Sequence, residues 1–291
     1  MNLRGRTLRR QDAVGFGFTV PILVLFLVFG LLPTIYAFAV SLTEFDLFSP
    51  PTFVGLDNYS RLLNSPNFWR ALAVTVTYTL MFGPASWLIG FLMAYLLKDK
   101  VLGRDAFRSV FFVPTILSSV AMAVTWSLLL RLNGPVNAVF DIDVPWLTNT
   151  QTALLGISLL GIWQSVGWWM VIFLAGLLSI PEDLIEAARI DGAGPFGVLR
   201  HISLPLLRPV FAIVAIQTVV AGMKVFSPMF IMTGGGPNNS TRSIAMLIYQ
   251  EGLRDLRFGN AAAISVVGFA IIMVLTVIYL RVFRVREEIG Y

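Results

Sequence analysis

What the 291-residue sequence lacks excludes several kinds of chemistry. It contains no cysteine, which excludes a disulfide framework and any thiolate metal or redox site. It contains a single histidine, His201, so a multi-histidine metal site is excluded as well. No Gly-x4-Gly-Lys-Ser/Thr phosphate loop occurs, and we therefore expect no nucleotide, metal or other cofactor to bind to this chain itself.

Charge is scarce, and apolar residues dominate. Charged residues make up 13% of the chain, whereas hydrophobic residues make up 57% and the mean hydropathy is +0.80. An ordinary globular domain carries about 25% charged residues, so this composition predicts an integral membrane protein. The formal net charge of +5 could suggest a nucleic-acid partner, but the basic residues lie at the ends of apolar stretches. Positive residues that flank membrane spans explain the charge better, and no nucleic acid is expected.

Six apolar stretches are long enough to cross a bilayer, which requires about 20 predominantly apolar residues. We expect all six to be helices within one all-α membrane domain that extends over residues 1–291. The first stretch is too long for the apolar core of a secretory signal, so it is expected to be an uncleaved span. The predicted spans cover residues 13–42, 71–97, 109–130, 152–178, 210–232 and 261–280.

The distribution of basic residues orients these spans. Lysine and arginine number fourteen in the N-terminal arm, the 98–108 segment, the 181–208 region and the C-terminal tail, and six in the segments on the other side. Because cytoplasmic segments are enriched in lysine and arginine, both termini and the 181–205 loop are expected in the cytoplasm. The remaining basic residue, Lys224, lies inside the fifth span.

The polar segment between the fourth and fifth spans has explicit helix boundaries. Pro181, followed by two acidic residues, is typical of a helix start, where negative charge lies near the positive end of the helix. Gly192 and Gly194 suit the left-handed residue that ends a helix. Pro195 can begin a second helix, and Pro205 and Pro209 are expected to close it and start the next span. Two short helices joined at a glycine corner would form a compact docking element for a partner with a groove. The alternative is a long loop with an interfacial helix.

The spacing within this segment follows a pattern without a departure. Glu-Ala-Ala is followed after three residues by Gly and after nine more by Ile-x-Leu-Pro, at Glu186, Ala187, Ala188, Gly192, Ile202, Leu204 and Pro205. This pattern resembles the coupling-loop signature of the membrane subunits of binding-protein-dependent ABC importers. Residues 49–59, 112–114 and 233–237 also resemble carbohydrate permeases of the maltose and glycerol-phosphate importer type. Because the 131–151 loop is short, the chain resembles the six-span version without a large external domain.

This resemblance implies a type I ABC importer permease fold and a heteromeric complex in a prokaryotic cell membrane. The chain would form a path for a sugar or related polyol together with a second homologous permease. Two ATPase subunits would bind ATP and Mg²⁺, and an extracytoplasmic substrate-binding protein would deliver the substrate. The segment from Glu186 to Pro205, which includes Asp191, would be a coupling helix seated in a cleft of an ATPase subunit, where Glu186 would meet a basic group. Closure of the ATPase pair would then rock the spans as rigid bodies.

Polar and aromatic residues within the spans are candidates for substrate contact, because polar groups are costly in a membrane. Gln164 and Trp168 are four residues apart on one helical face, with Trp163 close by, and Gln217 and Lys224 are seven apart on one face of the fifth span. An aromatic ring beside amide or charged groups would suit a carbohydrate. Alternatively, the tryptophans belong to interfacial belts, the glutamines bond across helices and Lys224 extends toward the membrane surface.

Two other classes of protein compete with this interpretation. An ion-gradient-driven secondary transporter usually has internal repeats and buried carboxylates for coupling ions, but none of the six predicted spans contains Asp or Glu. An intramembrane enzyme would need paired carboxylates, a His-Asp cluster or a serine beside a base, and no span carries them. We therefore predict a non-catalytic permease subunit, with ATP hydrolysis in a separate partner.

Overall fold

The structure is a computed structural model that describes residues 17, 19–99 and 103–282. These residues are mostly helical, with a single sheet of two short strands among them, so the all-α prediction is confirmed. The described residues form two compact units: those up to residue 64 together with 248–267 make unit 1, and those of 65–247 together with 268–282 make unit 2. The single membrane domain predicted over 1–291 stays a prediction.

Unit 1 is built on a long apolar helix followed by a small hairpin. The helix runs from Thr19 to Ser41 and contains a π-helical turn. Residue Thr43 of the first strand is opposite Phe53 of the second, in antiparallel register. The elements of unit 1 are η1 (Leu27–Leu31), α2 (Leu32–Ser41), β1 (Thr43–Glu44), β2 (Thr52–Phe53), α3 (Asp57–Leu63), the end of α14 (Ile244–Tyr249), η3 (Gln250–Arg254) and the beginning of α15 (Phe258–Val282).

Asn58 of α3 holds the base of the hairpin in place. Its side-chain nitrogen donates to the backbone oxygens of Ser41 and Thr43, both at 2.8 Å, and its side-chain oxygen accepts from the Arg61 guanidinium at 2.6 Å. Because Asn58 is only 2% exposed, these bonds satisfy polar groups that water cannot reach. Gly259 of α15 approaches the same point so closely that a Cβ atom there would clash with the Thr43 carbonyl oxygen.

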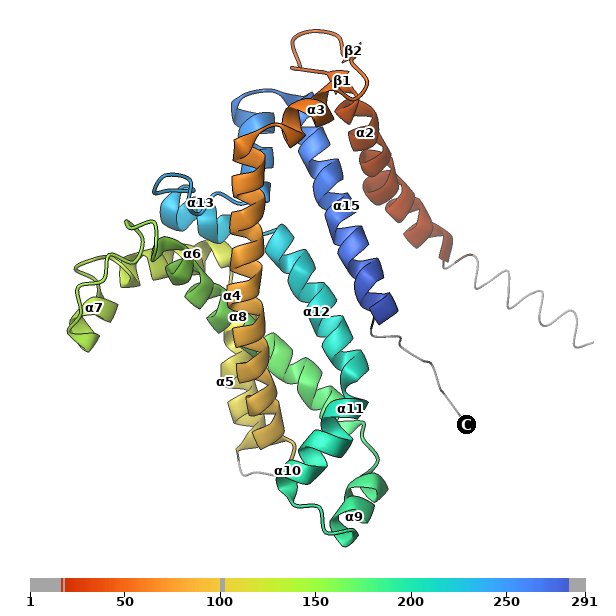
Figure 1. Cartoon of the computed structure of the whole chain (residues 1–291), viewed down its shortest axis with the longest axis vertical. Coiled ribbons are helices and arrows are strands. Elements are labelled where there is room, and N and C mark those ends of the chain that lie inside the picture. The colour runs from red at the N-terminus through yellow and green to blue at the C-terminus, as the bar shows by residue number, and fades with distance from the viewer. Residues whose placement is uncertain (1–16, 18, 100–102, 283–291) are drawn as a thin grey trace, which may run out of the picture. The chain divides into compact units, whose positions relative to one another are not determined.

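Two long helices, α4 (Pro66–Leu97) and α8 (Ala153–Leu178), pack against each other along unit 2 (Figure 1). α5 (Arg104–Ile116) packs on α8, and α12 (Arg208–Met223) packs on α4. Buried aromatic and aliphatic side chains fill the space between these helices, among them Tyr78, Phe82, Ile157, Leu160, Met170, Phe173 and Val214. The shorter helices of this unit include α6 (Ser119–Leu129), α7 (Pro135–Phe140) and α13 (Ser227–Thr233).

Glycines allow the helices of unit 2 to approach closely. A Cβ atom at Gly167 of α8 would meet the backbone carbonyl oxygen of Phe111 in α5, and one at Gly222 of α12 would meet the side chain of Thr79 in α4. Small residues at such crossings are typical of helices packed in membranes, where close van der Waals contact replaces the hydrophobic driving force.

Replacing Gly167 with alanine is expected to destabilise unit 2 by roughly 1–3 kcal/mol, because the backbone of Phe111 cannot move aside as a flexible side chain could. Thermal unfolding of the purified protein in detergent should show a lower Tm than the parent. Gly268→Ala in α15 is the matched control, since the nearest atoms would lie at 3.9 Å, an ordinary contact distance. Equal Tm values for the two variants would contradict this packing.

Four helices of the described chain are individually long and apolar enough to cross a membrane, and six segments qualify if each of two bent helix pairs is one span. The predicted 109–130 span falls on α5 and α6, which form one bent pair with an angle of 95°. The other bent pair joins the helical segment Pro195–Leu206 to α12 at 63°, and the predicted 210–232 span falls on α12 and α13. The predicted first span begins at residue 13, and its residues 13–16 and 18 lie outside the described residues. The individually long helices are Thr19–Ser41, Pro66–Leu97, Ala153–Leu178 and Phe258–Arg281.

Candidate functional site

The segment between α8 and α12 folds into two helical pieces joined at a tight corner. α9 (Glu182–Ile190) begins directly after Pro181, with two acidic residues in its first turn. Gly192 has a φ of +85°, in the left-handed region that glycine adopts without strain, and its N–H donates to the Arg189 carbonyl at 3.0 Å. The second piece extends over α10 (Pro195–Val198), η2 (Leu199–Ser203) and α11 (Leu204–Leu206).

Two details of this segment differ from the sequence-based expectation. Gly194 is not left-handed: its φ is −70°, and it is the residue that precedes α10. Pro205 does not close the second helix either, because the π-helical turn η2 immediately before it widens the backbone and accommodates the missing N–H of proline. The helix continues to Leu206, and the chain then bends by 63° into α12.

Four of the predicted loop residues are exposed, and the other four are half-buried. Glu186, Ala187, Asp191 and Gly192 are exposed. The half-buried residues are Ala188, Ile202, Leu204 and Pro205. Figure 1 shows α9 and α10 at the end of unit 2 where α4 ends and α5 begins.

Large apolar side chains on this projection are also exposed. Ile190 is 87% exposed and Phe196 is 70% exposed, on either side of the glycine corner. Apolar side chains that gather on a small polar projection mark a surface for contact with another protein.

A second feature of unit 2 is a cavity of about 460 Å³ beside two breaks in the helices. The first break separates α5, which ends at Ile116, from α6, which begins at Ser119. The second separates α12, which ends at Met223, from α13, which begins at Ser227. Within a membrane, non-helical backbone is tolerated only where protein buries it or where it lines a water-filled cavity. The paired breaks therefore make this cavity a candidate transport path.

The cavity brings together four of the five residues that the sequence marked for substrate contact. Gln164 and Trp168 reach it from α8, Gln217 from α12, and Lys224 from the break that follows α12. The indole nitrogen of Trp168 donates to the side-chain oxygen of Gln217 at 3.0 Å. Trp163 lies elsewhere: its ring is 5.8 Å from that of Trp126, between centroids, and it lines a separate apolar cavity.

Several other cavity residues carry polar groups, and sequence reasoning missed two of them, Thr115 and Ser165. Thr115 of α5 donates its hydroxyl to the backbone oxygen of Gln164 at 2.9 Å. Trp169 is 3% exposed, and its indole nitrogen has no hydrogen-bond partner within the described chain. Ser165 could have been found, because it shares a helical face with Trp168, three residues further on. Thr115 could not, because its place beside α8 depends on long-range packing.

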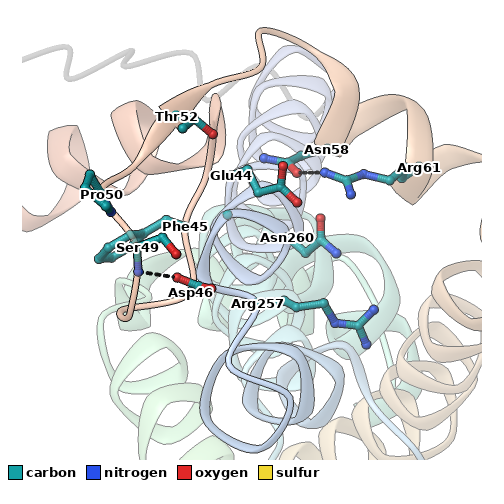
Figure 2. Close-up of a pocket in the computed structure, with 11 residues that line it drawn as sticks. Glu44, Phe45, Asp46, Ser49, Pro50, Thr52, Asn58, Arg61, Arg257 and Asn260 are labelled. Atoms are coloured by element: carbon teal, nitrogen blue, oxygen red, sulfur yellow. Dashed lines mark hydrogen bonds between the residues drawn. The ribbon is translucent and has the colours of Figure 1, made fainter.

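A separate polar pocket of about 390 Å³ lies in unit 1 (Figure 2), and it contains none of the predicted site residues. The carboxylate of Asp46 accepts the backbone N–H of Ser49 at 2.8 Å, which lowers the pKa of that carboxyl group. Arg257 pairs with Glu251 at 3.2 Å and with Asp255 at 3.1 Å. The charged residues that line the pocket are Glu44, Asp46, Arg61 and Arg257.

The long apolar helices are typical of a multi-pass membrane protein. The cavity beside two helix breaks, and the exposed loop between α8 and α12, suit a subunit of a transport system. The chain belongs to the family of binding-protein-dependent transport system inner membrane components, whose sequence profile matches residues 63–287. It is thus a permease subunit of an ABC transport system, and the resemblance seen in the sequence is confirmed.

Named relatives match nearly the whole chain. The trehalose/maltose transport system permease protein MalF of Thermococcus litoralis is 33% identical over 294 residues, which cover 99% of each chain. The multiple sugar-binding transport system permease protein MsmF of Streptococcus mutans is 31% identical, over 81% of this chain and 82% of its own length.

The fold has a close match among solved structures. A chain of a bacterial ABC transporter involved in the import of the acidic polysaccharide alginate superposes with a TM-score of 0.81 at 22% identity, covering 98% of this chain and 100% of its own. A chain of the MetNI methionine ABC transporter gives a TM-score of 0.54 at 18% identity, over 76% of this chain. The predicted type I ABC importer permease fold is therefore confirmed.

Proposed function

We propose that this permease imports a sugar or related polyol as part of a heteromeric complex. A second homologous permease would complete the path, two ATPase subunits would bind ATP and Mg²⁺, and an extracytoplasmic binding protein would deliver the substrate. The names of the relatives, which include trehalose/maltose and multiple-sugar permeases, support a saccharide substrate. The excess of lysine and arginine in the segments beside the termini supports a cytoplasmic position for both ends and for the 181–205 loop.

One observation carries the proposal: two of the helices that line the cavity, α8 and α12, are the two helices that the exposed loop connects. Gln164 and Trp168 lie on α8, which ends at Leu178, and Gln217 lies on α12, which begins at Arg208. Trp168 is ten residues from the end of α8, or about 15 Å along the helix at 1.5 Å per residue. A force on the loop therefore acts directly on both walls of the cavity.

The hydrogen bond between Trp168 and Gln217 spans these two walls, from α8 to α12. A rigid-body shift of one helix relative to the other would lengthen or release it, and so change the shape of the cavity. In the proposed complex, closure of the ATPase pair supplies this shift through α9. Glu186, Ala187, Asp191 and Gly192 would face the ATPase cleft, since all four are exposed, and the cavity side chains would contact the substrate.

Uptake by the complete complex should depend on ATP and persist when ion gradients are collapsed. The measurement is accumulation of a labelled sugar panel in proteoliposomes that contain both permeases, the ATPase and the binding protein, with ATP inside and with protonophore and sodium ionophore added. A non-hydrolysable ATP analogue is the control and should stop uptake. Uptake that needs an ion gradient and ignores ATP would instead support the secondary-transporter alternative.

A further inference from the structure

The cavity beside α8 and α12 carries one formal charge, and that charge is positive. Lys224 is the only charged residue among the described residues that line it, and no Asp or Glu is among them. The ammonium group makes no hydrogen bond or ion pair with another described residue. Lys224 is exposed in the described chain, so its ammonium group is open to a ligand. A cation within a predicted membrane span favours an anionic or acceptor-rich partner.

Neutral polar groups of the cavity can donate hydrogen bonds as well. Thr115 and Ser165 already donate their hydroxyl hydrogens, to the backbone oxygens of Gln164 and Gly161. The side-chain oxygen of Gln217 is occupied by Trp168, which leaves the amide N–H groups of Gln217 free to donate.

The buried indole N–H of Trp169 is a further donor, because it has no hydrogen-bond partner in the described part of the chain. A neutral sugar presents hydroxyl groups that donate as well as accept, and this cavity holds no carboxylate to receive them. An anionic group only accepts hydrogen bonds, so it matches Lys224, the amide N–H groups of Gln217 and the indole N–H of Trp169. The hydroxyl groups of a sugar ring can bond to the other polar groups that line the cavity, which include those of Gln164, Ser119 and Ser227.

We propose that the transported saccharide carries an anionic group, a carboxylate, phosphate or sulfate, whose oxygens bind Lys224 and the amide of Gln217. This inference rests on the proposed function and names the substrate class of the same cavity. The indole ring of Trp168 is 41% exposed, is hydrogen-bonded to Gln217 and lines the same cavity as Lys224, so it provides an apolar surface for the sugar ring. Charge-assisted hydrogen bonds to the anion would offset the cost of keeping Lys224 charged within the membrane.

Matched sugars that differ only in charge test the proposal in the reconstituted complex. The pairs are α-1,4-digalacturonate with α-1,4-digalactose, and glucose 6-phosphate with glucose. We expect import of an anionic member at a rate at least tenfold above that of its neutral partner. Import of the neutral members at an equal or higher rate would overturn the anionic assignment and leave sugar import standing. Import of no saccharide would overturn both proposals.

Variants at Lys224 separate substrate recognition from assembly. Lys224→Met removes the charge and keeps the apolar stem, and it should reduce uptake of the anionic sugar about tenfold or more. Lys224→Arg keeps the charge and should retain most of the uptake. Both complexes should elute intact from size-exclusion chromatography. Unchanged uptake in Lys224→Met would contradict the proposal, and so would its dissociation, which would show that Lys224 pairs with a carboxylate of the second permease.

Discussion

Replacing Glu186 with lysine is expected to abolish coupled uptake while the chain still inserts into the membrane. Glu186 is exposed on α9, and its carboxylate forms no ion pair within the described residues, so it is available to a partner. If it meets a basic group in the ATPase cleft, charge reversal replaces an attraction with a repulsion. Loss of a desolvated charge pair at an interface costs roughly 2–5 kcal/mol, which corresponds to a fall in uptake of about 30-fold or more.

The measurement is sugar uptake per amount of permease in the membrane, together with ATP hydrolysis by the complex. Asp99→Lys is the matched control, because it makes the same change of charge in the short segment after α4, outside the loop. The control should transport at close to the parental rate. Normal uptake in Glu186→Lys, or an equal loss in both variants, would contradict the role given to Glu186.

Replacing Gly192 with valine is expected to uncouple uptake from ATP hydrolysis. The cause would be strain in the backbone at this position, rather than contact with other atoms. Gly192 has a φ of +85°, and a Cβ atom placed there would have no neighbour within 4 Å, so steric contact does not contribute. An ordinary residue in the left-handed region costs roughly 1–2 kcal/mol, and a β-branched residue costs more. The corner between α9 and α10 should therefore open or shift, and uptake should fall about tenfold.

Gly194→Val is the control for this second prediction, two residues further along the same corner. Gly194 also has open space around its Cβ position, but its φ of −70° and ψ of 173° suit valine. We expect near-parental uptake for Gly194→Val and retained ATP hydrolysis without uptake for Gly192→Val. Equal transport by the two variants would show that the left-handed corner is not needed.

Helix boundaries and the loop could be predicted because their signals are local. Pro181 and the acidic residues after it mark the start of α9, and only glycine fits the backbone at position 192, so a short segment of sequence determines both. The long apolar stretches that became α4 and α8 were equally clear, since hydropathy depends on composition and length alone.

The bend between α5 and α6 could not be predicted, because three polar residues within a long apolar stretch do not by themselves break a helix. No glycine or proline occupies Leu117 or Ser118, where the helix breaks, and Pro84 lies inside the uninterrupted helix α4. Tertiary packing decides which of these positions breaks. The predicted 109–130 span therefore appeared as one straight stretch in the sequence.

The candidate path was predictable in part. Gln164 and Trp168 share a face of α8, and the structure places both at the cavity. Trp163 is one residue, or about 100° of helical rotation, away from Gln164, so it points to a different face. The sequence offered no sign of the polar contacts of Asn58 in unit 1, since they join residues that are 15 and 17 positions apart.

The central claim is that the exposed loop at α9 contacts the ATPase, and the absence of cysteine from the chain allows a direct test. A benzophenone cross-linker is attached to Ala187→Cys, which is exposed on α9, and to Val139→Cys on α7, where the side chain is 77% exposed. Irradiation of the assembled complex should join the ATPase to position 187 and not to position 139, and Glu186→Lys should weaken the product. Capture of the ATPase at position 139, or its absence at position 187 in an active complex, would contradict the account.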